Sequence, residues 1–195
     1  MLALPGRCSL EPVPSVVNLR PMTLEDLPAV GMWLREPHVA RWWTPDSTAE
    51  RELAQLRARL KEGASSATKL CTVSFGGRPV GWCQWYRWED YPTEAEAVGA
   101  EDGEVGADYA IGVVDLLGRG LGTAMIAALA QEVGRHHRGA GMLIAPEAAN
   151  AASRRVLEKN GFRLQSIRAL ATEPHDRPMA IYRLEPLELD GAGQR

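Results

Sequence analysis

The chain has 195 residues, of which 45% are hydrophobic and 24% are charged, and these values are typical of one globular domain with a sizeable core. The net charge of −3 argues against general nucleic-acid binding, and no apolar run is long enough to cross a membrane. The cysteines lack the spacing of a metal site, and Cys71 and Cys83 are expected to be reduced core thiols. We therefore expect a cytoplasmic enzyme or binding protein, monomeric or homodimeric, without a metal.

In chain order, two segments with little periodicity flank the predicted elements, and we expect flexible tails at residues 1–15 and 186–195 around a single domain at residues 16–185. Apolar runs bounded by turn residues predict seven strands: Val16–Arg20, Lys69–Phe75, Pro79–Trp88, Val105–Val114, Gly141–Ala145, Phe162–Leu170 and Pro178–Leu184. Apolar spacing and capping signals predict four helices: residues 23–36, Ser47–Glu62, Leu121–His136 and Asn150–Asn160. Residues 38–43 are expected to form a short helical turn or loop, and Tyr91–Gly103 to be irregular.

The predicted elements follow each other in the order β-α-α-β-β-β-α-β-α-β-β. Strands that are neighbours in the sequence, such as the pair joined by the turn signal Gly76-Gly77, alternate in this order with strands separated by a helix. We therefore expect an α/β (α+β) domain in which a mixed, mostly antiparallel central sheet is flanked by helices.

A strand, a glycine-rich turn and a helix N-terminus follow each other around residues 117–123. Glycines let a ligand approach the backbone closely, and the first N–H groups of a helix bind anions, so this unit predicts an anion site. A Walker loop would need a lysine where Thr123 follows Gly122. A dinucleotide-binding fingerprint would need an acid about 20 residues further on, and residues 140–145 contain none. Neither nucleotide-binding motif therefore explains the turn.

The turn, Leu117-Gly118-Arg119-Gly120-Leu121-Gly122, resembles the acyl-CoA pyrophosphate loop of the Gcn5-related N-acetyltransferase (GNAT) superfamily, Gln/Arg-x-x-Gly-x-Gly/Ala, with leucine at its first position. The segment from Asn150 to Phe162 resembles the last helix of that superfamily, Asn-x-x-Ala-x-x-x-Tyr-x-Lys-x-Gly-Phe. The two motifs stand in the order and structural context that the superfamily uses. The resemblance covers roughly residues 17–184 and implies the GNAT fold.

The resemblance implies acetyl-CoA as the cosubstrate. The N–H groups of residues 118–123 would hold its pyrophosphate, and free backbone groups near residues 111–114 would bind its pantetheine arm and the developing oxyanion. An asparagine on the last helix would also reach it, although this residue could instead be a plain helix N-cap. The expected cofactor-binding residues are Ile111, Val113, Val114, Gly118, Arg119, Gly120, Leu121, Gly122, Thr123 and Asn150.

Within the superfamily, the closest resemblance is to aminoglycoside 6′-N-acetyltransferases, enzymes of antibiotic resistance. His38-Val39-Ala40-Arg41-Trp42-Trp43 resembles their His-Ile-Val-Glu-Trp-Trp segment, and Gly81-Trp82-Cys83-Gln84-Trp85-Tyr86 resembles their Gly-Tyr-Ala-Gln-Ser-Tyr strand. Their catalytic aspartate, counted back from the glycine loop, falls on Asp108. The resemblance implies direct acetyl transfer to a primary amine of a polycationic small molecule, with Asp108 as the base. The expected substrate-binding residues are Trp42, Trp43, Gln84, Tyr86, Glu101, Asp102 and Asp108.

Two sequence features around Asp108 support an amine substrate. Strand periodicity places Ala110 and Gly112 on the same face as Asp108, and these small residues would leave room for a substrate. Eight acids and no basic residue lie from Glu89 to Asp108, and without them the net charge of −3 becomes +5. Such a negative lobe suits a polycation. The alternatives are an exposed strand start for Asp108 and a solvated loop for the acidic stretch.

One departure from the superfamily pattern leaves the mechanism incomplete. The superfamily places a tyrosine, the acid that protonates the leaving thiolate, where this chain has Leu157. Tyr109 and Tyr182 are unranked replacements. A siderophore-type N-acyltransferase that modifies hydroxylysine is an alternative function, although that group carries histidine at position 108. A third hypothesis is a non-catalytic acyl-CoA-binding domain.

Overall fold

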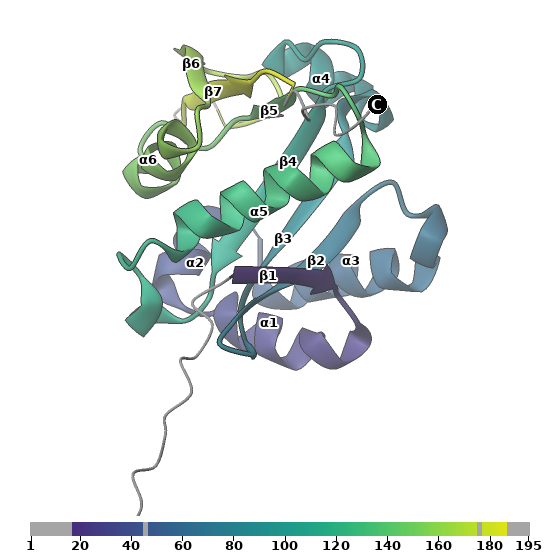
Figure 1. The fold of residues 1–195 in the computed structure, drawn as a ribbon, viewed down its shortest axis with the longest axis vertical. Coiled ribbons are helices and arrows are strands. Elements are labelled where there is room, and N and C mark those ends of the chain that lie inside the picture. The colour runs from purple at the N-terminus through teal and green to yellow at the C-terminus, as the bar shows by residue number, and fades with distance from the viewer. Residues whose placement is uncertain (1–16, 45–46, 175–176, 187–195) are drawn as a thin grey trace, which may run out of the picture.

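The computed structural model describes residues 17–44, 47–174 and 177–186, which form one seven-stranded sheet with helices on both faces (Figure 1). The strands lie in the order β1-β2-β3-β4-β5-β7-β6. Their bounds are β1 Val17–Pro21, β2 Lys69–Phe75, β3 Arg78–Arg87, β4 Val105–Ile111, β5 Met142–Ile144, β6 Arg163–Arg168 and β7 Met179–Leu184. All neighbouring pairs are antiparallel except β4 and β5. The predicted mixed, mostly antiparallel sheet is therefore confirmed.

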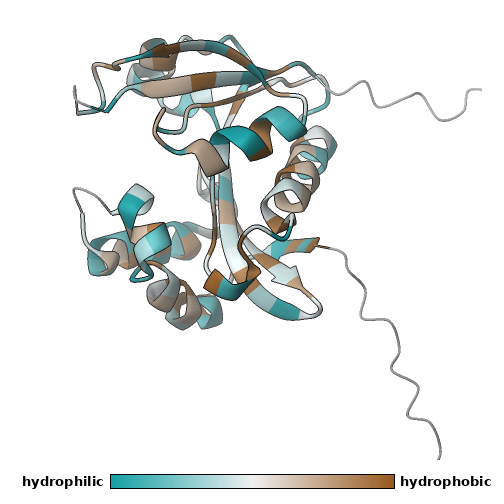
Figure 2. Ribbon diagram, turned by 90° about the vertical axis from the view of Figure 1, so that its left-hand side faces the viewer, coloured by the Kyte–Doolittle hydropathy of each residue, from teal (hydrophilic) through white to brown (hydrophobic). Residues whose placement is uncertain are grey.

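Two groups of helices cover opposite faces of the sheet. The helices are α1 Leu27–Trp33, α2 Pro37–Trp43, α3 Ala49–Glu62, α4 Pro92–Val98, α5 Leu121–His136 and α6 Ala151–Lys159. Short 3₁₀ turns occur at Leu24–Asp26, Gly63–Ser65, Trp88–Asp90 and Val114–Leu116. Figure 2 views the sheet nearly edge-on, with α1–α3 on one side and α5 on the other. Among the described residues there are three apolar clusters: one beneath α5, one beneath α1–α3 and a smaller one that includes Val98 of α4.

Most predicted elements occur within a few residues of their expected bounds, and α5 matches its prediction residue for residue. The hairpin between β2 and β3 turns at Gly76 and Gly77, whose φ angles are +56° and +76°. Positive φ favours glycine at both positions. Cys71 and Cys83 are buried free thiols, as expected. None of the helices in the described ranges is both long and apolar enough to span a bilayer.

The acidic segment between β3 and β4 is not irregular, because its residues Pro92–Val98 form α4. Pro92 is its first residue and Gly99 ends it with a left-handed backbone, φ +74°. Proline at the first helical position and glycine after the last one are helix signals. The prediction of irregular structure here was therefore wrong.

The parallel pair β4 and β5 touches at one end only. Val105 pairs with Met142 and donates its N–H to the Gly141 carbonyl at 3.0 Å, and beyond this point the two strands share no further pairing. The backbone groups of the even-numbered residues along β4 face β3, since the N–H of Gly112, which follows the strand, donates to the Val80 carbonyl at 2.8 Å. Backbone groups alternate sides along an antiparallel pair. Those of Tyr109 and Ile111 therefore face the gap between β4 and β5.

Candidate active site

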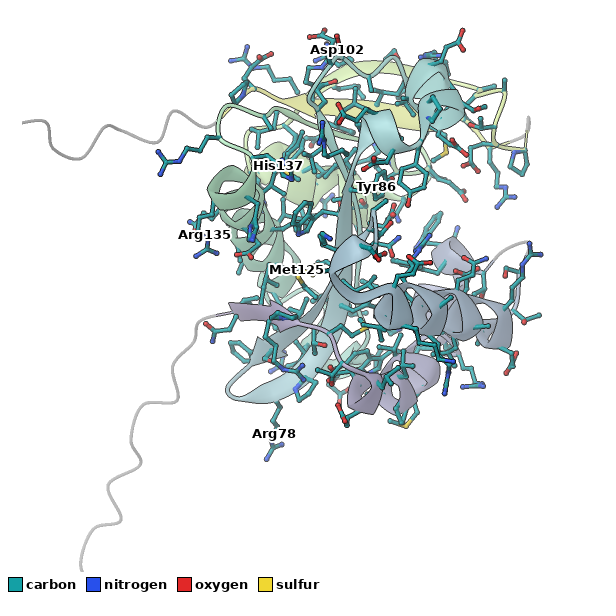
Figure 3. The ribbon with its side chains drawn as sticks, turned by 90° about the vertical axis from the view of Figure 1, so that its right-hand side faces the viewer. Arg78, Tyr86, Asp102, Met125, Arg135 and His137 are labelled. Carbon is teal, nitrogen blue, oxygen red and sulfur yellow. The ribbon has the colours of Figure 1, made fainter. Side chains whose placement is uncertain are left out.

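A cavity of about 1020 Å³ lies where β4 and β5 diverge. One side of it, called here the loop side, is lined by the turn before α5 and by α6. The other, called the aromatic side, is lined by α2, α3, β3 and α4. Figure 3 shows Tyr86 projecting from β3 on the side of the sheet where α3 and α4 lie, whereas Met125 lies between the sheet and α5. The cavity thus connects the two faces of the sheet through the gap beside β4.

The glycine turn lines the loop side with Leu116, Leu117, Gly118, Gly120, Gly122 and Thr123. Gly118 and Gly120 have φ angles of +72° and +84°, a backbone conformation that L-residues with a side chain rarely adopt. A side-chain carbon at either position would meet only open space, so the backbone here is exposed to a ligand. The N-terminal N–H groups of α5 follow directly, which makes this side suited to an anion.

Four of the predicted cofactor residues lie outside the cavity lining: Val113, Val114, Arg119 and Leu121. Leu121 is only 5% exposed and packs in the core beneath α5. The Val113 N–H is directed at the Val80 carbonyl at 3.4 Å. The backbone groups that face the gap therefore belong to Ile111, which is in the predicted stretch 111–114, and to Tyr109, which lies two residues before it.

Helix α6 contributes a capped N-terminus and two cations. Asn150 lines the cavity, and its Oδ1 also accepts the Ser153 N–H at 3.0 Å, so the residue is the N-cap of α6 as well. Arg155 and Lys159 line the same side. The sequence analysis missed these two residues. Their spacing of four on a helix that follows the predicted cofactor-binding asparagine was the signal that could have found them.

Asp108 lies inside β4, opposite Gln84 on β3, and lines the cavity. Gln84 Nε2 donates to Asp108 Oδ2 at 2.8 Å, and Arg59 Nη1 on α3 donates to Gln84 Oε1 at 2.9 Å. Burial raises the pKa of Asp108 above its ordinary value, while the hydrogen bond from Gln84 and the charge of Arg59 lower it. The alternative that Asp108 lies at the exposed start of the strand is therefore wrong.

Aromatic side chains form the wall of the second side. Trp42 and Trp43 line the cavity, and the Trp43 ring packs at 4.8 Å between centroids on Trp82, which is fully buried. Trp85 is 4% exposed and also belongs to the core. His38 Nε2 lies 3.0 Å from the Ile111 carbonyl oxygen and joins α2 to β4.

The predicted room at Gly112 is filled. A side-chain carbon there would overlap the Trp33 ring, so glycine is needed for helix packing and not for a substrate. Ala110 does line the cavity. The prediction was therefore wrong for Gly112, because a residue from α1 that is distant in sequence occupies the space.

Of the acidic stretch from Glu89 to Asp108, only Glu94 and Asp108 line the cavity. Glu101 and Asp102 do not line it, and Figure 3 shows Asp102 at the top of the molecule, away from Tyr86. Glu101 and Glu104 both pair with Arg183 on β7, at 2.8 Å each. The carboxylates in the lining are Glu52, Glu94, Asp108, Glu147 and Glu173. The carboxylates of the cavity therefore come from several elements, and Arg51 and Arg59 line the aromatic side together with Glu52 and Glu94.

The three positions connected with the missing acid differ sharply in their surroundings. Leu157 is fully buried in the core. The Tyr182 hydroxyl donates to Glu158 Oε1 at 2.6 Å and accepts from Arg154 Nε at 3.1 Å, and Tyr182 does not line the cavity. Tyr109 does line it, with its hydroxyl 2.7 Å from Ser153 Oγ. Within the described residues no group of histidine, cysteine and acidic side chains could hold a metal ion.

Residues 23–170 match the family described as acetyltransferase (GNAT) domain. The chain belongs to this family, and the protein is therefore an enzyme of the acyltransferase class. The matched residues begin after β1 and end after β6, so they include the glycine turn, α6 and most of the cavity lining.

Two groups of curated relatives are about one quarter identical to the chain. It is 26% identical over 159 residues to aminoglycoside N(6′)-acetyltransferase type 1 of Klebsiella pneumoniae, covering 76% of this chain and 75% of that protein. It is 27% identical over 183 residues to lysine N-acyltransferase MbtK of Mycobacterium tuberculosis, covering 92% and 83%. The solved structure of AAC(6′)-Ib with ribostamycin and coenzyme A superposes with a TM-score of 0.69 at 25% identity, over 87% of this chain and 93% of that one. The predicted superfamily and fold are thus confirmed.

Proposed function

We propose that this enzyme transfers an acetyl group from acetyl-CoA directly to a primary amine of a polycationic small molecule, with an aminoglycoside 6′-amine as the first candidate. Asp108 is the base in this proposal. The observation that carries it is the position of the Asp108 carboxylate in the cavity, beside the gap between β4 and β5, with further carboxylates around it.

The loop side suits acetyl-CoA. Its glycine backbone and the N-terminus of α5 supply N–H donors for a pyrophosphate, and Arg155 and Lys159 add positive charge. The gap beside β4 would admit the pantetheine arm. The Ile111 N–H faces this gap and would donate to the oxyanion that forms on the thioester carbonyl. The similar structure of AAC(6′)-Ib contains coenzyme A, which supports acyl-CoA as the ligand of this chain.

The aromatic side suits a cationic amine. Glu52 on α3, Glu94 on α4 and Asp108 on β4 come from separate elements, so they would contact separate ammonium groups of one substrate. Trp42 and Trp43 would stack against sugar rings or cations. A substrate with several amines spread over a rigid frame meets this arrangement better than one with a single amine.

Asp108 can act on the amine because its environment moves its pKa upward. At its ordinary pKa a carboxylate is a weak base for an ammonium, because the ammonium pKa is much higher. Burial raises the Asp108 pKa and so narrows the difference between the two pKa values. The carboxylate would take one amine proton, directly or through water, as the nitrogen attacks the thioester carbon. Gln84 holds the carboxylate in place during this step.

A screen of coenzyme A release tests the proposal. Acetyl-, succinyl- and long-chain acyl-CoA are each offered with aminoglycosides and with hydroxylysine. The proposal predicts the highest kcat/KM for acetyl-CoA with an aminoglycoside, and a product acetylated at the 6′-amine by mass spectrometry and NMR. Turnover of hydroxylysine alone, or of no amine, would overturn it.

A second candidate function is N-acylation of a lysine-type substrate. The match to lysine N-acyltransferase MbtK covers 92% of the chain, and Arg51 on α3 lines the aromatic side, where it would pair with the carboxylate of an amino acid. Preference for hydroxylysine and a long-chain acyl-CoA in the same screen would favour this function over the first.

A further inference from the structure

The departure of the thiolate is the step for which the superfamily tyrosine is missing. When the C–S bond breaks, the sulfur of coenzyme A receives the electron pair and needs a proton or a hydrogen-bond donor. The hydroxyl groups that line the loop side of the described cavity include those of Tyr109 and Ser153. These two hydroxyls lie 2.7 Å apart and share a hydrogen bond.

The Tyr109 hydroxyl contacts α6 one turn before position 157, where the superfamily carries its tyrosine. Ser153, its partner, is four residues before Leu157 on α6. Residues four apart on a helix are neighbours on one face, with about 5–6 Å between their Cβ atoms. The phenol of β4 therefore reaches the turn of α6 from which a tyrosine at position 157 would project, while Leu157 itself is buried in the core.

We propose that Tyr109, held in position by Ser153, is the acid that protonates the sulfur of the departing coenzyme A. The proposal rests on acetyl-CoA as the acyl donor and not on the identity of the amine. Tyr182 cannot take this role from its place in the structure, because its hydroxyl is engaged by Arg154 and Glu158 outside the cavity lining.

The proton balance of the step is complete. The amine nitrogen forms the new C–N bond and releases one proton to Asp108 or water. The C–S bond breaks, its electron pair stays on sulfur, and the Tyr109 O–H proton passes to that sulfur. The resulting phenolate regains a proton from solvent through the Ser153 hydroxyl. The net reaction converts an amine and acetyl-CoA into an amide and the free thiol.

The surroundings of Tyr109 keep its hydroxyl protonated before the step. Burial raises its pKa, as does the negative charge of Asp108, while the hydrogen bond shared with Ser153 opposes this rise. The other ionisable groups that face this part of the cavity are Arg155 and Lys159 on α6, with Tyr182 on β7 behind them. The variant Tyr109→Phe removes only the phenol oxygen and leaves all of these ionisable groups in place.

The variant Tyr109→Phe removes that oxygen and tests the proposal by kinetics. We expect kcat to fall about 10²-fold or more, the range typical of a lost general acid, while the Kd for acetyl-CoA changes less than about threefold. Tyr182→Phe is the matched control, because it also removes a phenol that ties α6 to the sheet. It is expected to keep kcat within about twofold. Ser153→Ala should lower kcat less than Tyr109→Phe, since the phenol remains.

A titration of bound coenzyme A separates catalysis from structural damage and needs no amine substrate. The ultraviolet absorbance of the thiolate is followed against pH in the complex of coenzyme A with each variant. A hydroxyl that donates to sulfur stabilises the thiolate, so the thiol pKa should be about one unit higher in Tyr109→Phe than in wild type and in Tyr182→Phe. An unchanged thiol pKa together with a kcat above half of wild type would overturn the role of Tyr109. Failure of every amine to react would count against the proposed function and leave this titration valid.

Discussion

The hydrogen-bond relay from Arg59 through Gln84 to Asp108 makes a prediction about a residue that does not itself touch the carboxylate. Arg59 holds the Oε1 end of the Gln84 amide at 2.9 Å, and the Nε2 end donates to Asp108 at 2.8 Å. Because each end has its own partner, Arg59 fixes which end faces the base. Replacement of Arg59 by leucine removes this constraint and also removes a positive charge that lowers the Asp108 pKa.

The expected effect can be worked out from these two losses. A hydrogen bond to a charged group contributes about 1.5–3 kcal/mol, and about 1.4 kcal/mol corresponds to tenfold in rate, so kcat/KM at pH 7 should fall about tenfold or more. Removal of the Arg59 charge raises the Asp108 pKa. The base acts when deprotonated, so the acidic limb of the kcat/KM profile should move to higher pH. Glu52, whose charge raises the same pKa, remains in place.

The assay is kcat/KM for the best amine from pH 5.5 to 9, with acetyl-CoA saturating. Arg51→Leu is the matched control, because Arg51 lies on the same helix and lines the same cavity. Arg59→Lys keeps the charge and should restore the acidic limb more than it restores the rate. Identical profiles and rates for Arg59→Leu and Arg51→Leu would refute the relay.

Three further predictions follow from other parts of the structure. Gly120→Val should raise the KM for acetyl-CoA far more than that for the amine, because it forces a left-handed backbone position into strain and covers the exposed N–H groups; equal acetyl-CoA affinity by calorimetry would contradict this. The double variant Glu52→Gln/Glu94→Gln should weaken amine binding and its salt dependence, whereas Glu101→Gln/Asp102→Asn should not, since only the first pair lines the cavity; the reverse order of effects would restore the acidic stretch as the substrate site. Asp26, whose pKa is lowered to about 2 by its hydrogen bond from Arg20, should stabilise the fold above pH 4 and lose that contribution as pH falls toward 2; thermal unfolding of wild type and Asp26→Asn should therefore converge in that range.

Features that depend on a few neighbouring residues were predicted correctly from the sequence. The glycines before α5 and the asparagine before α6 act through backbone geometry within a few residues, and both stand in the structure where the sequence placed them. Asp108 was located by its distance from the glycine turn, and β3 and β4 then bring it against Gln84, which the resemblance had indicated separately.

The errors come from contacts between elements that are distant in sequence. Trp33 on α1 fills the space at Gly112, and nothing near Gly112 in the sequence indicates this. The eight acids from Glu89 to Asp108 suggested one lobe, but Arg183 on β7 pairs with Glu101 and Glu104, which do not line the cavity. Arg59 was likewise invisible as part of the site, because a lysine or arginine on an amphipathic helix is most often a solvated residue.

The search for an acid to replace the superfamily tyrosine also depends on contacts between elements that are distant in sequence. The sequence shows that Leu157 cannot supply a proton, and it leaves two tyrosines as equal candidates. The structure separates them, because the β4 register directs Tyr109 toward Ser153 and the cavity, while the β7 register directs Tyr182 toward Arg154 and Glu158. Register is a property of strand pairing and cannot be read from either strand alone.

The most direct test of the account is the turnover of Asp108→Asn with the best amine at pH 7, measured beside its acetyl-CoA affinity. The change conserves volume, and Gln84 retains an oxygen to which it can donate, so folding should be unaffected. The account predicts a kcat about 10²–10⁴-fold below wild type with an unchanged Kd for acetyl-CoA, and a partial recovery at high pH where the amine is already neutral. A kcat equal to that of wild type at pH 7 would show that Asp108 is not the base.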